Sequence, residues 1–184
     1  MEDKKIIEHL KNGDEFIYKY VYDQYVRVVF SVCRKMTGSK EEAEDAAQDV
    51  FIKVFSSIDS FRADSKLSTW IYRISVNVCL NRQRRKKIIK FLSFDFWNEE
   101  NELTDENITP SKSIERSELE GIVRDAINRL PAKQKTALIL SRYEEKSYKE
   151  IAEIMEVSLS AVESLLFRAK ENLAKKLISL ENYL

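Results

Sequence analysis

The sequence predicts an all-α protein with two small helical domains, an acidic linker between them, and a helix-turn-helix in the second domain. Glycine and proline are scarce, with 3 and 2 among 184 residues, whereas Glu, Lys, Leu, Ile and Ala are plentiful. This composition is typical of helical proteins. Apolar residues recur at helical spacing, and the pattern breaks between residues 91 and 113. A chain of this length can hold two domains that each bury a core.

The break in the pattern sets the predicted domains: 1–92, a linker at 93–112, and 113–184. The linker is acidic, and Thr109-Pro110 disfavours a continuous helix. The aromatic residues at 91–97 are too apolar for a fully solvated tether. We expect them to pack on the first domain or on a partner.

The charges balance over the whole chain but are unevenly distributed. Residues 62–90 carry nine Lys or Arg against one acidic residue, and residues 91–120 carry two against nine. A neutral total predicts weak binding to free DNA, because that affinity comes mainly from neutralised phosphates. The basic block nevertheless indicates a local site for a polyanion.

Three helices are predicted in the first 55 residues. The first spans 2–11, and the second runs from a cap at Asp14 to Thr37, with Gly38 as its stop. Ser39 and Glu42 form a capping-box pattern that opens the third, at 41–55. One side of this third helix is a mostly acidic ridge: Glu41, Glu44, Asp45, Gln48, Asp49 and Lys53. A solvated helix face explains any single carboxylate, but the set together could be a docking surface.

A loop at 58–67, carrying Phe61, leads into a long helix that starts near Leu67. Trp70 is expected in its core face. The other sides carry Tyr72, Arg73, Asn77, Asn81, Arg84, Arg85 and Lys87. Aromatic rings beside amides and cations suit unpaired DNA, which binds by base stacking and backbone contacts. Cations at a helix C-terminus are also favoured by the helix dipole, but five in residues 82–87 exceed that need.

The second domain is predicted to contain four helices. A helix over 113–129 stops at Leu130-Pro131, and another follows through Tyr143. Ser147 and Glu150 form a second capping box, which opens a short helix that stalls at 156–158. In the next helix the inward residues are Val162, Leu165, Leu166, Ala169 and Leu173. Two helices and a tight turn predict a helix-turn-helix, whose second helix fits the DNA major groove. An ordinary antiparallel helix pair is the alternative.

Other classes of function have little support in the sequence. The charged N-terminus and the absence of a long apolar run suggest neither export nor membrane insertion, so we expect a cytoplasmic protein. Cys33 and Cys79 lack metal-ligand spacing and are expected to be buried free thiols. There is no P-loop, glycine-rich fingerprint or H-E-x-x-H motif. We therefore expect no enzyme activity, no metal and no cofactor.

Several stretches together resemble one family, the extracytoplasmic-function group of bacterial RNA polymerase sigma factors. They are A-E-D-A-A-Q-D-V-F-I-K-V-F at 43–55, F-R-A-D-S-K-L-S-T-W-I-Y-R-I-S-V-N at 61–77, L-P-A-K-Q-K-T-A-L-I-L-S-R-Y at 130–143 and the helix-turn-helix at 147–170. The order and spacing of these stretches make the resemblance specific. It implies a factor that binds core RNA polymerase and directs promoter recognition and transcription initiation.

The resemblance also implies roles for individual residues. Polymerase binding would fall to Asp45, Gln48, Asp49, Phe51 and Lys53. The −10 element would be read by Phe61, Arg62, Asp64, Lys66, Ser68, Thr69, Trp70, Tyr72, Arg73, Asn77, Asn81, Arg84 and Arg85. The −35 element would be read by Lys149, Ser158, Ser160, Ala161, Glu163, Ser164, Phe167, Arg168 and Lys170. Many relatives are inhibited by an anti-sigma factor, so one is expected as a partner here.

The turn of the helix-turn-helix departs from a common pattern, and an alternative function is open. Glu156 occupies the turn where many helix-turn-helices have Gly, and a non-Gly residue adopts positive φ only at some cost. The chain could also be a stand-alone helix-turn-helix regulator with an N-terminal helical interaction domain. Its neutral net charge argues against such unaided DNA binding.

Overall fold

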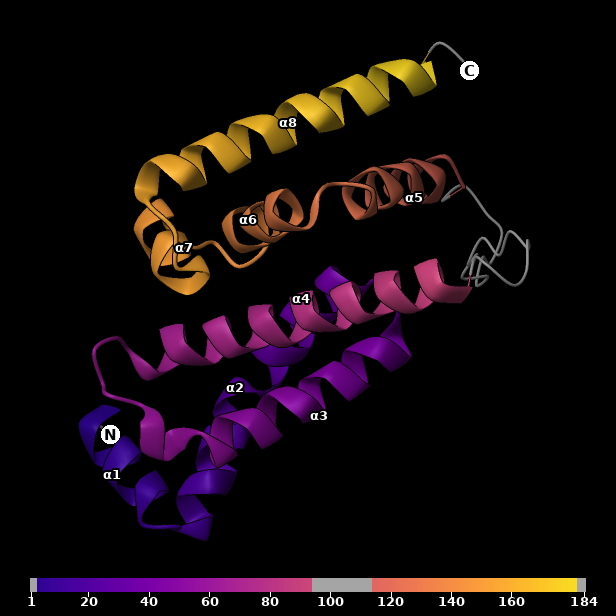
Figure 1. The fold of residues 1–184 in the computed structure, drawn as a ribbon. Coiled ribbons are helices and arrows are strands. Elements are labelled where there is room, and N and C mark those ends of the chain that lie inside the picture. The colour runs from indigo at the N-terminus through magenta and orange to yellow at the C-terminus, as the bar shows by residue number, and fades with distance from the viewer. Residues whose placement is uncertain (1–2, 94–113, 182–184) are drawn as a thin grey trace.

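A computed structural model describes residues 3–93 and 114–181, and in these ranges all regular structure is helical (Figure 1). The elements are α1 (Asp3–Lys11), α2 (Glu15–Thr37), α3 (Lys40–Ser56), the short 3-10 helix η1 (Ile58–Ser60), α4 (Leu67–Ser93), α5 (Ile114–Asn128), α6 (Ala132–Arg142), α7 (Tyr148–Met155) and α8 (Leu159–Glu181). The predicted all-α fold with a C-terminal helix-turn-helix is therefore confirmed. The aromatic linker residues expected to pack lie outside the residues whose side chains are described.

Helices α2, α3 and α4 pack side by side, and their boundaries follow the predicted signals. The Asp14 side chain accepts from the backbone N–H of Phe16 at 3.0 Å, and Gly38 ends α2 with φ 85°. The capping box at α3 was predicted wrongly, because only half of it forms. Ser39 accepts from the N–H of Glu42 at 3.5 Å, but the Glu42 carboxylate pairs with Lys86 of α4.

The helix-turn-helix forms as its local sequence predicts. Ser147 Oγ accepts from the N–H of Glu150 at 3.3 Å, and the Glu150 carboxylate accepts from the N–H of Ser147 at 2.9 Å. Glu156 ends α7 in the left-handed conformation with φ 53°, as its place in the turn required. Ser158 Oγ then accepts from the N–H of Ala161 at 3.2 Å in the first turn of α8.

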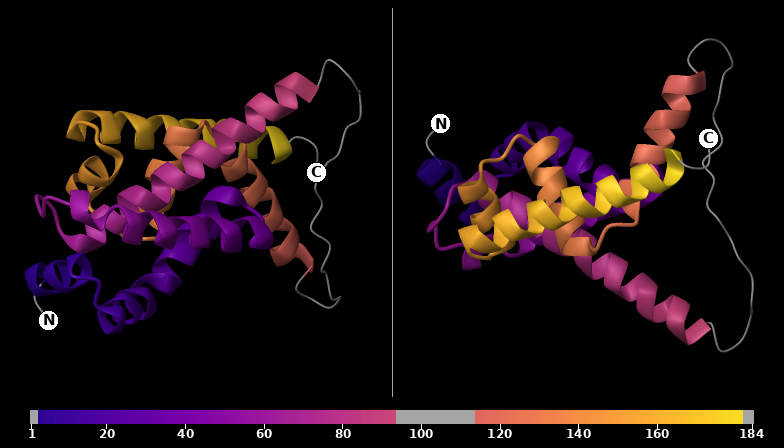
Figure 2. Two further views of the ribbon diagram at one scale, coloured as in Figure 1. Left: turned by 60° about the horizontal axis from the view of Figure 1, so that its bottom comes forward. Right: turned by 90° about the horizontal axis from the view of Figure 1, so that it is seen from above.

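The helices before and after the linker pack against each other. Helix α7 lies on α4 and α6 lies on α2, so the buried apolar residues form one cluster that extends from α1 to α8 (Figure 1). The C-terminal end of α4 and the N-terminal end of α5 extend away from these packed helices and point in different directions (Figure 2). The packing places the helix-turn-helix directly beside α4, the helix predicted to read promoter DNA.

The two cysteine thiols lie close together, one on α2 and the other on α4. Cys33 and Cys79 are both buried and free, with their Sγ atoms 3.7 Å apart. The hydrogen bond to Cys79 and burial raise the pKa of Cys33, so its thiol stays protonated and unreactive. These residues belong to the core, as predicted.

Candidate protein and nucleic-acid interfaces

The acidic ridge is an exposed surface of α3. The side chains of Glu41, Glu44, Asp45, Gln48, Asp49 and Lys53 all face solvent. Their spacing of three and four residues places them along one side of the helix. The ridge is thus a preformed row of carboxylate, amide and ammonium groups.

The ridge is partly neutralised by α4, which the sequence analysis did not foresee. Arg82 Nη2 lies 2.6 Å from Asp49 Oδ2, and Arg82 Nη1 lies 3.9 Å from Asp45 Oδ2. One turn further along α4, Lys86 pairs with Glu42. Two of the five cations at 82–87 therefore hold α4 to α3 and are not free for DNA. The i, i+4 spacing of Arg82 and Lys86 matches acidic residues spaced three and four apart on α3, which was the available signal.

Phe51 lies in the core and not on the ridge. Its side chain is 6% exposed, and its ring centroid is 4.7 Å from that of Tyr22 and 5.9 Å from that of Phe55. The neighbouring Ile52 is 66% exposed and borders the ridge. The exposed apolar side chain beside the ridge is therefore Ile52.

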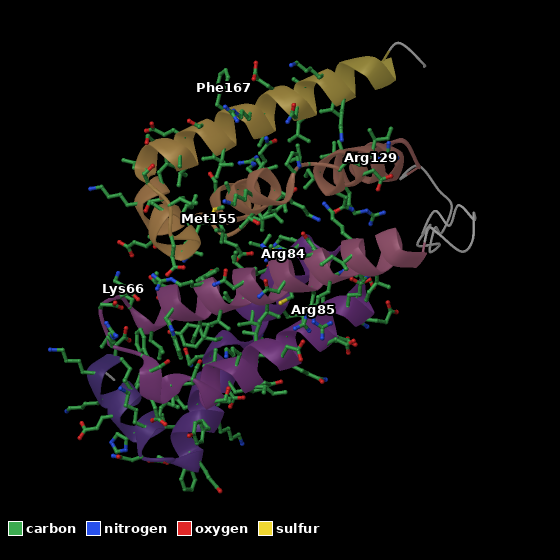
Figure 3. All side chains as sticks on the ribbon, viewed as in Figure 1. Lys66, Arg84, Arg85, Arg129, Met155 and Phe167 are labelled. Atoms are coloured by element: carbon green, nitrogen blue, oxygen red, sulfur yellow. The ribbon has the colours of Figure 1, made fainter. Side chains whose placement is uncertain are left out.

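A groove of about 360 Å³ runs between α3 and the exposed side of α4. Its lining brings together Asp49, Ile52 and Lys53 of α3 with Ile74, Asn77, Asn81, Arg82 and Arg85 of α4. Members of the predicted polymerase set and of the predicted −10 set thus share one groove. Arg84 and Arg85 leave α4 on different sides, with Arg85 toward α3 (Figure 3).

The loop between η1 and α4 has buried ends and an exposed tip. Phe61 is 3% and Trp70 is 9% exposed, and their rings stack with centroids 4.6 Å apart. Thr69 is also buried and Ser68 half-buried, whereas Arg62, Asp64 and Lys66 face solvent. The stack of Phe61 on Trp70 of α4 therefore supports the shape of the loop, and the polar tip is the part available to a ligand.

Tyr72 and Arg73 are covered by residues 144–156, which run from the segment after α6 to the end of α7. The Tyr72 hydroxyl donates to Glu144 Oε2 at 3.2 Å, and Lys146 Nζ lies 4.4 Å from the centre of its ring. Burial and the Glu144 carboxylate raise the pKa of Tyr72. Arg73 Nη2 donates to the carbonyl oxygen of Glu153 at 3.1 Å, and Arg73 Nη1 pairs with Glu156 at 3.3 Å. In this arrangement Tyr72 is buried, and the half-buried Arg73 guanidinium is already bonded to Glu153 and Glu156.

Glu144 is the centre of this contact and was missed by the sequence analysis. It lies between α6 and α7, and its side chain is 7% exposed. Besides the Tyr72 hydroxyl, its carboxylate accepts from Ser31 Oγ at 2.9 Å and from Lys35 Nζ at 3.0 Å. No local pattern distinguishes Glu144 from the adjacent Glu145, because its partners are more than 70 residues away.

The outward side of α8 forms the second candidate DNA surface. Ser158, Ser160, Glu163, Ser164, Phe167, Arg168 and Lys170 are exposed there, as is Lys149 of α7, and Ala161 is half-buried. Phe167 is 63% exposed and projects from α8 on the side away from α6 (Figure 3). The predicted inward residues of α8 are buried or half-buried, so the helix presents its polar face to solvent.

Neither a cluster of metal ligands nor a membrane-spanning helix is found among the described residues. Within 3–93 and 114–181, no group of three His, Cys, Asp or Glu side chains is placed to hold a metal ion. Over the same ranges, no helix has the length and apolar character needed to cross a membrane.

Comparisons with known proteins identify the family. Sigma-70 region 2 matches residues 21–88, and Sigma-70 region 4 matches residues 120–173. The chain is 32% identical over 179 residues to the ECF RNA polymerase sigma factor SigW of Bacillus subtilis, covering 95% of this chain and 96% of the relative. It is 35% identical over 183 residues to the ECF RNA polymerase sigma-E factor of Haemophilus influenzae, covering 96% of each.

Two solved structures share the fold. The structure of CnrH in complex with the cytosolic domain of CnrY matches with a TM-score of 0.68 and 18% identity, over 96% of this chain and 97% of that one. The sigma factor RpoE, in complex with the anti-sigma factor NepR from Bartonella quintana, matches with a TM-score of 0.65 and 22% identity, over 87% and 96%.

The helical fold, the helix-turn-helix and both matched regions define a promoter-specificity factor of bacterial transcription. The chain belongs to the extracytoplasmic-function group of RNA polymerase sigma factors. It binds core RNA polymerase and directs promoter recognition at initiation, and it is not an enzyme. A stand-alone regulator is not favoured.

Proposed function

We propose that three surfaces divide the work of this sigma factor. The acidic ridge of α3, together with Ile52, docks on core polymerase. The loop tip at 62–66 and the exposed side of α4 bind the −10 element, and the outward side of α8 binds the −35 element. The ridge supports this division most directly, because its side chains are exposed while residues 144–156 still cover Tyr72 and Arg73.

We further propose that residues 1–92 and 113–184 act as separate units, joined by 93–112, once polymerase is bound. Tyr72 and Arg73 can contact promoter DNA only after Glu144 and Glu156 have moved away from them. Polymerase docking on the exposed ridge needs no such movement. The order of events would be docking first, separation of the two units second, and promoter reading third.

An inhibitor protein is part of the proposal. The two related folds described above were solved with the cytosolic domain of CnrY and with the anti-sigma factor NepR. A comparable anti-sigma factor would act on this chain by keeping the promoter-reading surfaces apart from DNA. Because its working partners are core polymerase and promoter DNA, we place the protein in the cytoplasm.

Reconstituted run-off transcription tests the proposal. Bacterial core polymerase with and without this protein would transcribe a pool of templates with randomised upstream sequences. We expect the protein to enrich two short elements at −10 and −35 spacing, and we expect the free protein to shift duplex DNA only weakly. Transcripts without any enriched element would contradict promoter selection by this chain.

Arg168, which is exposed on the outward side of α8, provides a separate test of the proposed −35 surface. Arg168→Ala should weaken use of the enriched −35 element by ~1–3 kcal/mol if the guanidinium contacts a base edge. The measurement is transcription from templates with the matched and the scrambled −35 element. Equal use of both templates by the parent protein would show that α8 reads no sequence.

A further inference from the structure

Helix α1 contacts both ends of the loop that the proposed function assigns to −10 capture. Asp3, its first residue, accepts through Oδ2 from the backbone N–H of Leu67 at 3.1 Å. Lys11, its last residue, donates from Nζ to the carbonyl oxygen of Phe61 at 3.0 Å. The two bonds join residues that are 64 and 50 positions apart in the sequence, and they enclose the exposed loop tip.

The bond from Asp3 supplies what the sequence beside α4 lacks. The residue before the first residue of α4 is Lys66, whose ammonium is a donor and cannot accept from a free backbone N–H. Helix N-termini expose such N–H groups and favour negative charge. Asp3 therefore acts as an N-terminal cap for α4 that comes from a different part of the chain.

Helix α1 is firmly anchored, so it can hold the loop in place. Ile6, Ile7 and Leu10 are buried in the main core cluster. The Tyr18 hydroxyl of α2 also donates to the carbonyl oxygen of Leu10 at 3.1 Å. The loop ends are therefore bonded to a helix that is itself fixed to the core.

The loop tip needs such support because its backbone is strained. Ala63 has φ 56°, a left-handed conformation that L residues adopt at a cost. Ala63 is exposed, so its own side chain contributes little packing that could offset this cost. The conformation depends on fixed loop ends, namely the Phe61–Trp70 stack and the two bonds from α1.

We propose that Asp3 and Lys11 are positioning residues for −10 recognition. They hold the loop at 61–67 in the shape that accepts an unpaired promoter strand, without touching DNA themselves. The inference rests on the proposed function of that loop. Helix α1 precedes residue 21, where the match to Sigma-70 region 2 begins, so the family match assigns it no role.

Strand binding by the reconstituted holoenzyme tests the inference. The probe is a fluorescent single-stranded oligonucleotide that carries the −10 element enriched from the randomised pool. An oligonucleotide with a scrambled −10 element is the control. For Asp3→Ala combined with Lys11→Met, we expect ~5- to 10-fold weaker binding of the matched strand, from the loss of two hydrogen bonds. Binding of the scrambled strand and of core polymerase should not change.

Control variants separate positioning from general destabilisation. Asp3→Asn keeps an acceptor and Lys11→Arg keeps a donor, so both should retain most of the discrimination. Glu8→Ala with Lys5→Met makes the same charge changes at exposed positions of α1 and should behave like the parent. Lys11→Met alone changes an exposed side chain, so it tests the inference even if the double variant unfolds.

The outcomes distinguish this inference from the proposed function. A parent holoenzyme that binds matched and scrambled strands equally would overturn −10 reading by the loop and the inference with it. A discriminating parent with unchanged Asp3 and Lys11 variants would overturn only the inference. Equal loss for both strands, or loss of polymerase binding, would assign α1 a purely structural role and also overturn it.

Discussion

The acidic ridge of α3 and the Tyr72–Arg73 side of α4 belong to the same group of packed helices but differ in access. Asp45 and Asp49 keep 68% and 49% of their side chains exposed, and Arg82 within that group partly neutralises their charge. Tyr72 and Arg73 instead have their partners in another part of the chain, at Glu144 before α7 and at Glu153 and Glu156. One surface is ready for a partner, and the other is already occupied.

Under the proposed division of surfaces, this difference predicts ready binding to polymerase and weak binding to free DNA. Surface ion pairs such as Arg82–Asp45 contribute ~0–1 kcal/mol and exchange easily with a partner's charges. A buried carboxylate with three donors is much harder to separate, because each exposed donor and acceptor must be satisfied again. The neutral net charge and the covered side of α4 should both weaken binding to free DNA.

Charge reversal on the ridge should have the largest effect. Asp45→Arg with Asp49→Arg places two cations beside Arg82 and should weaken association with core polymerase at least ~100-fold, as expected for like charges at an interface. The fold should persist, since exposed pairs contribute little stability. Co-purification and fluorescence anisotropy with core polymerase measure the effect.

A matched control for the ridge is Glu8→Arg with Asp59→Arg, which makes the same charge change at exposed positions of α1 and η1. It should leave polymerase binding intact. Association of the ridge variant at the strength of this control would refute the docking surface.

Removing the charge of Glu144 should uncover the second surface. Glu144→Gln keeps the side-chain size but weakens charge-assisted bonds from Lys35, Tyr72 and Ser31, at a cost of ~2 kcal/mol to the contact between the two units. The variant should have a larger radius of gyration in solution scattering. Without polymerase, it should also bind the matched −10 strand more tightly than the parent.

Glu145→Gln is the control for this variant, because Glu145 is adjacent in sequence and exposed. It should match the parent in both measurements. If Glu144→Gln also matched the parent, the Glu144 contact would not hold the two units together.

The smallest predicted effect is a pH dependence from Lys135 of α6. Lys135 is 5% exposed, and its Nζ donates to the carbonyl oxygen of Met36 and to Asn128 Oδ1, both at 2.8 Å. Desolvation lowers the pKa of Lys135 to about 8, below its ordinary value of 10.5. Between these values the unfolded chain binds more protons than the folded chain, so stability from this group rises with pH.

Denaturant unfolding of the parent and of Lys135→Met at several pH values from 7 to 9.5 measures this contribution. The stability of the parent relative to the variant should increase over that range. Lys133→Met, at an exposed position of the same helix, is the control and should show no such trend. A flat difference for Lys135→Met would mean that the Lys135 ammonium is not desolvated in the folded protein.

Local patterns were sufficient for most of the secondary structure. The caps at Asp14 and Ser147, the stop at Gly38 and the left-handed turn at Glu156 each depend on a few neighbouring residues, so the sequence predicts them. The same holds for the inward and outward sides of α8. The family was also predictable, because its motifs occur in order along the chain.

Contacts between distant segments could not be predicted in the same way. Glu42 was expected to complete a capping box, but Lys86, 44 residues away, takes its carboxylate. The family resemblance assigned Phe51 to the polymerase-binding set, but its side chain lies in the core. Tyr72 looked available and is covered, because helix periodicity describes one helix and does not say which other helix packs against it.

The sequence by itself determined the helices, the caps at Asp14 and Ser147, the helix-turn-helix and the membership of the sigma factor family, since these depend on local hydrogen bonding and on motif spacing. Only the tertiary structure decided which charges are paired, which aromatic side chains are buried, and that Asp3 caps α4 while Glu144 joins the two units. Those outcomes depend on side chains from distant segments competing for the same partners, and the folded packing decides that competition.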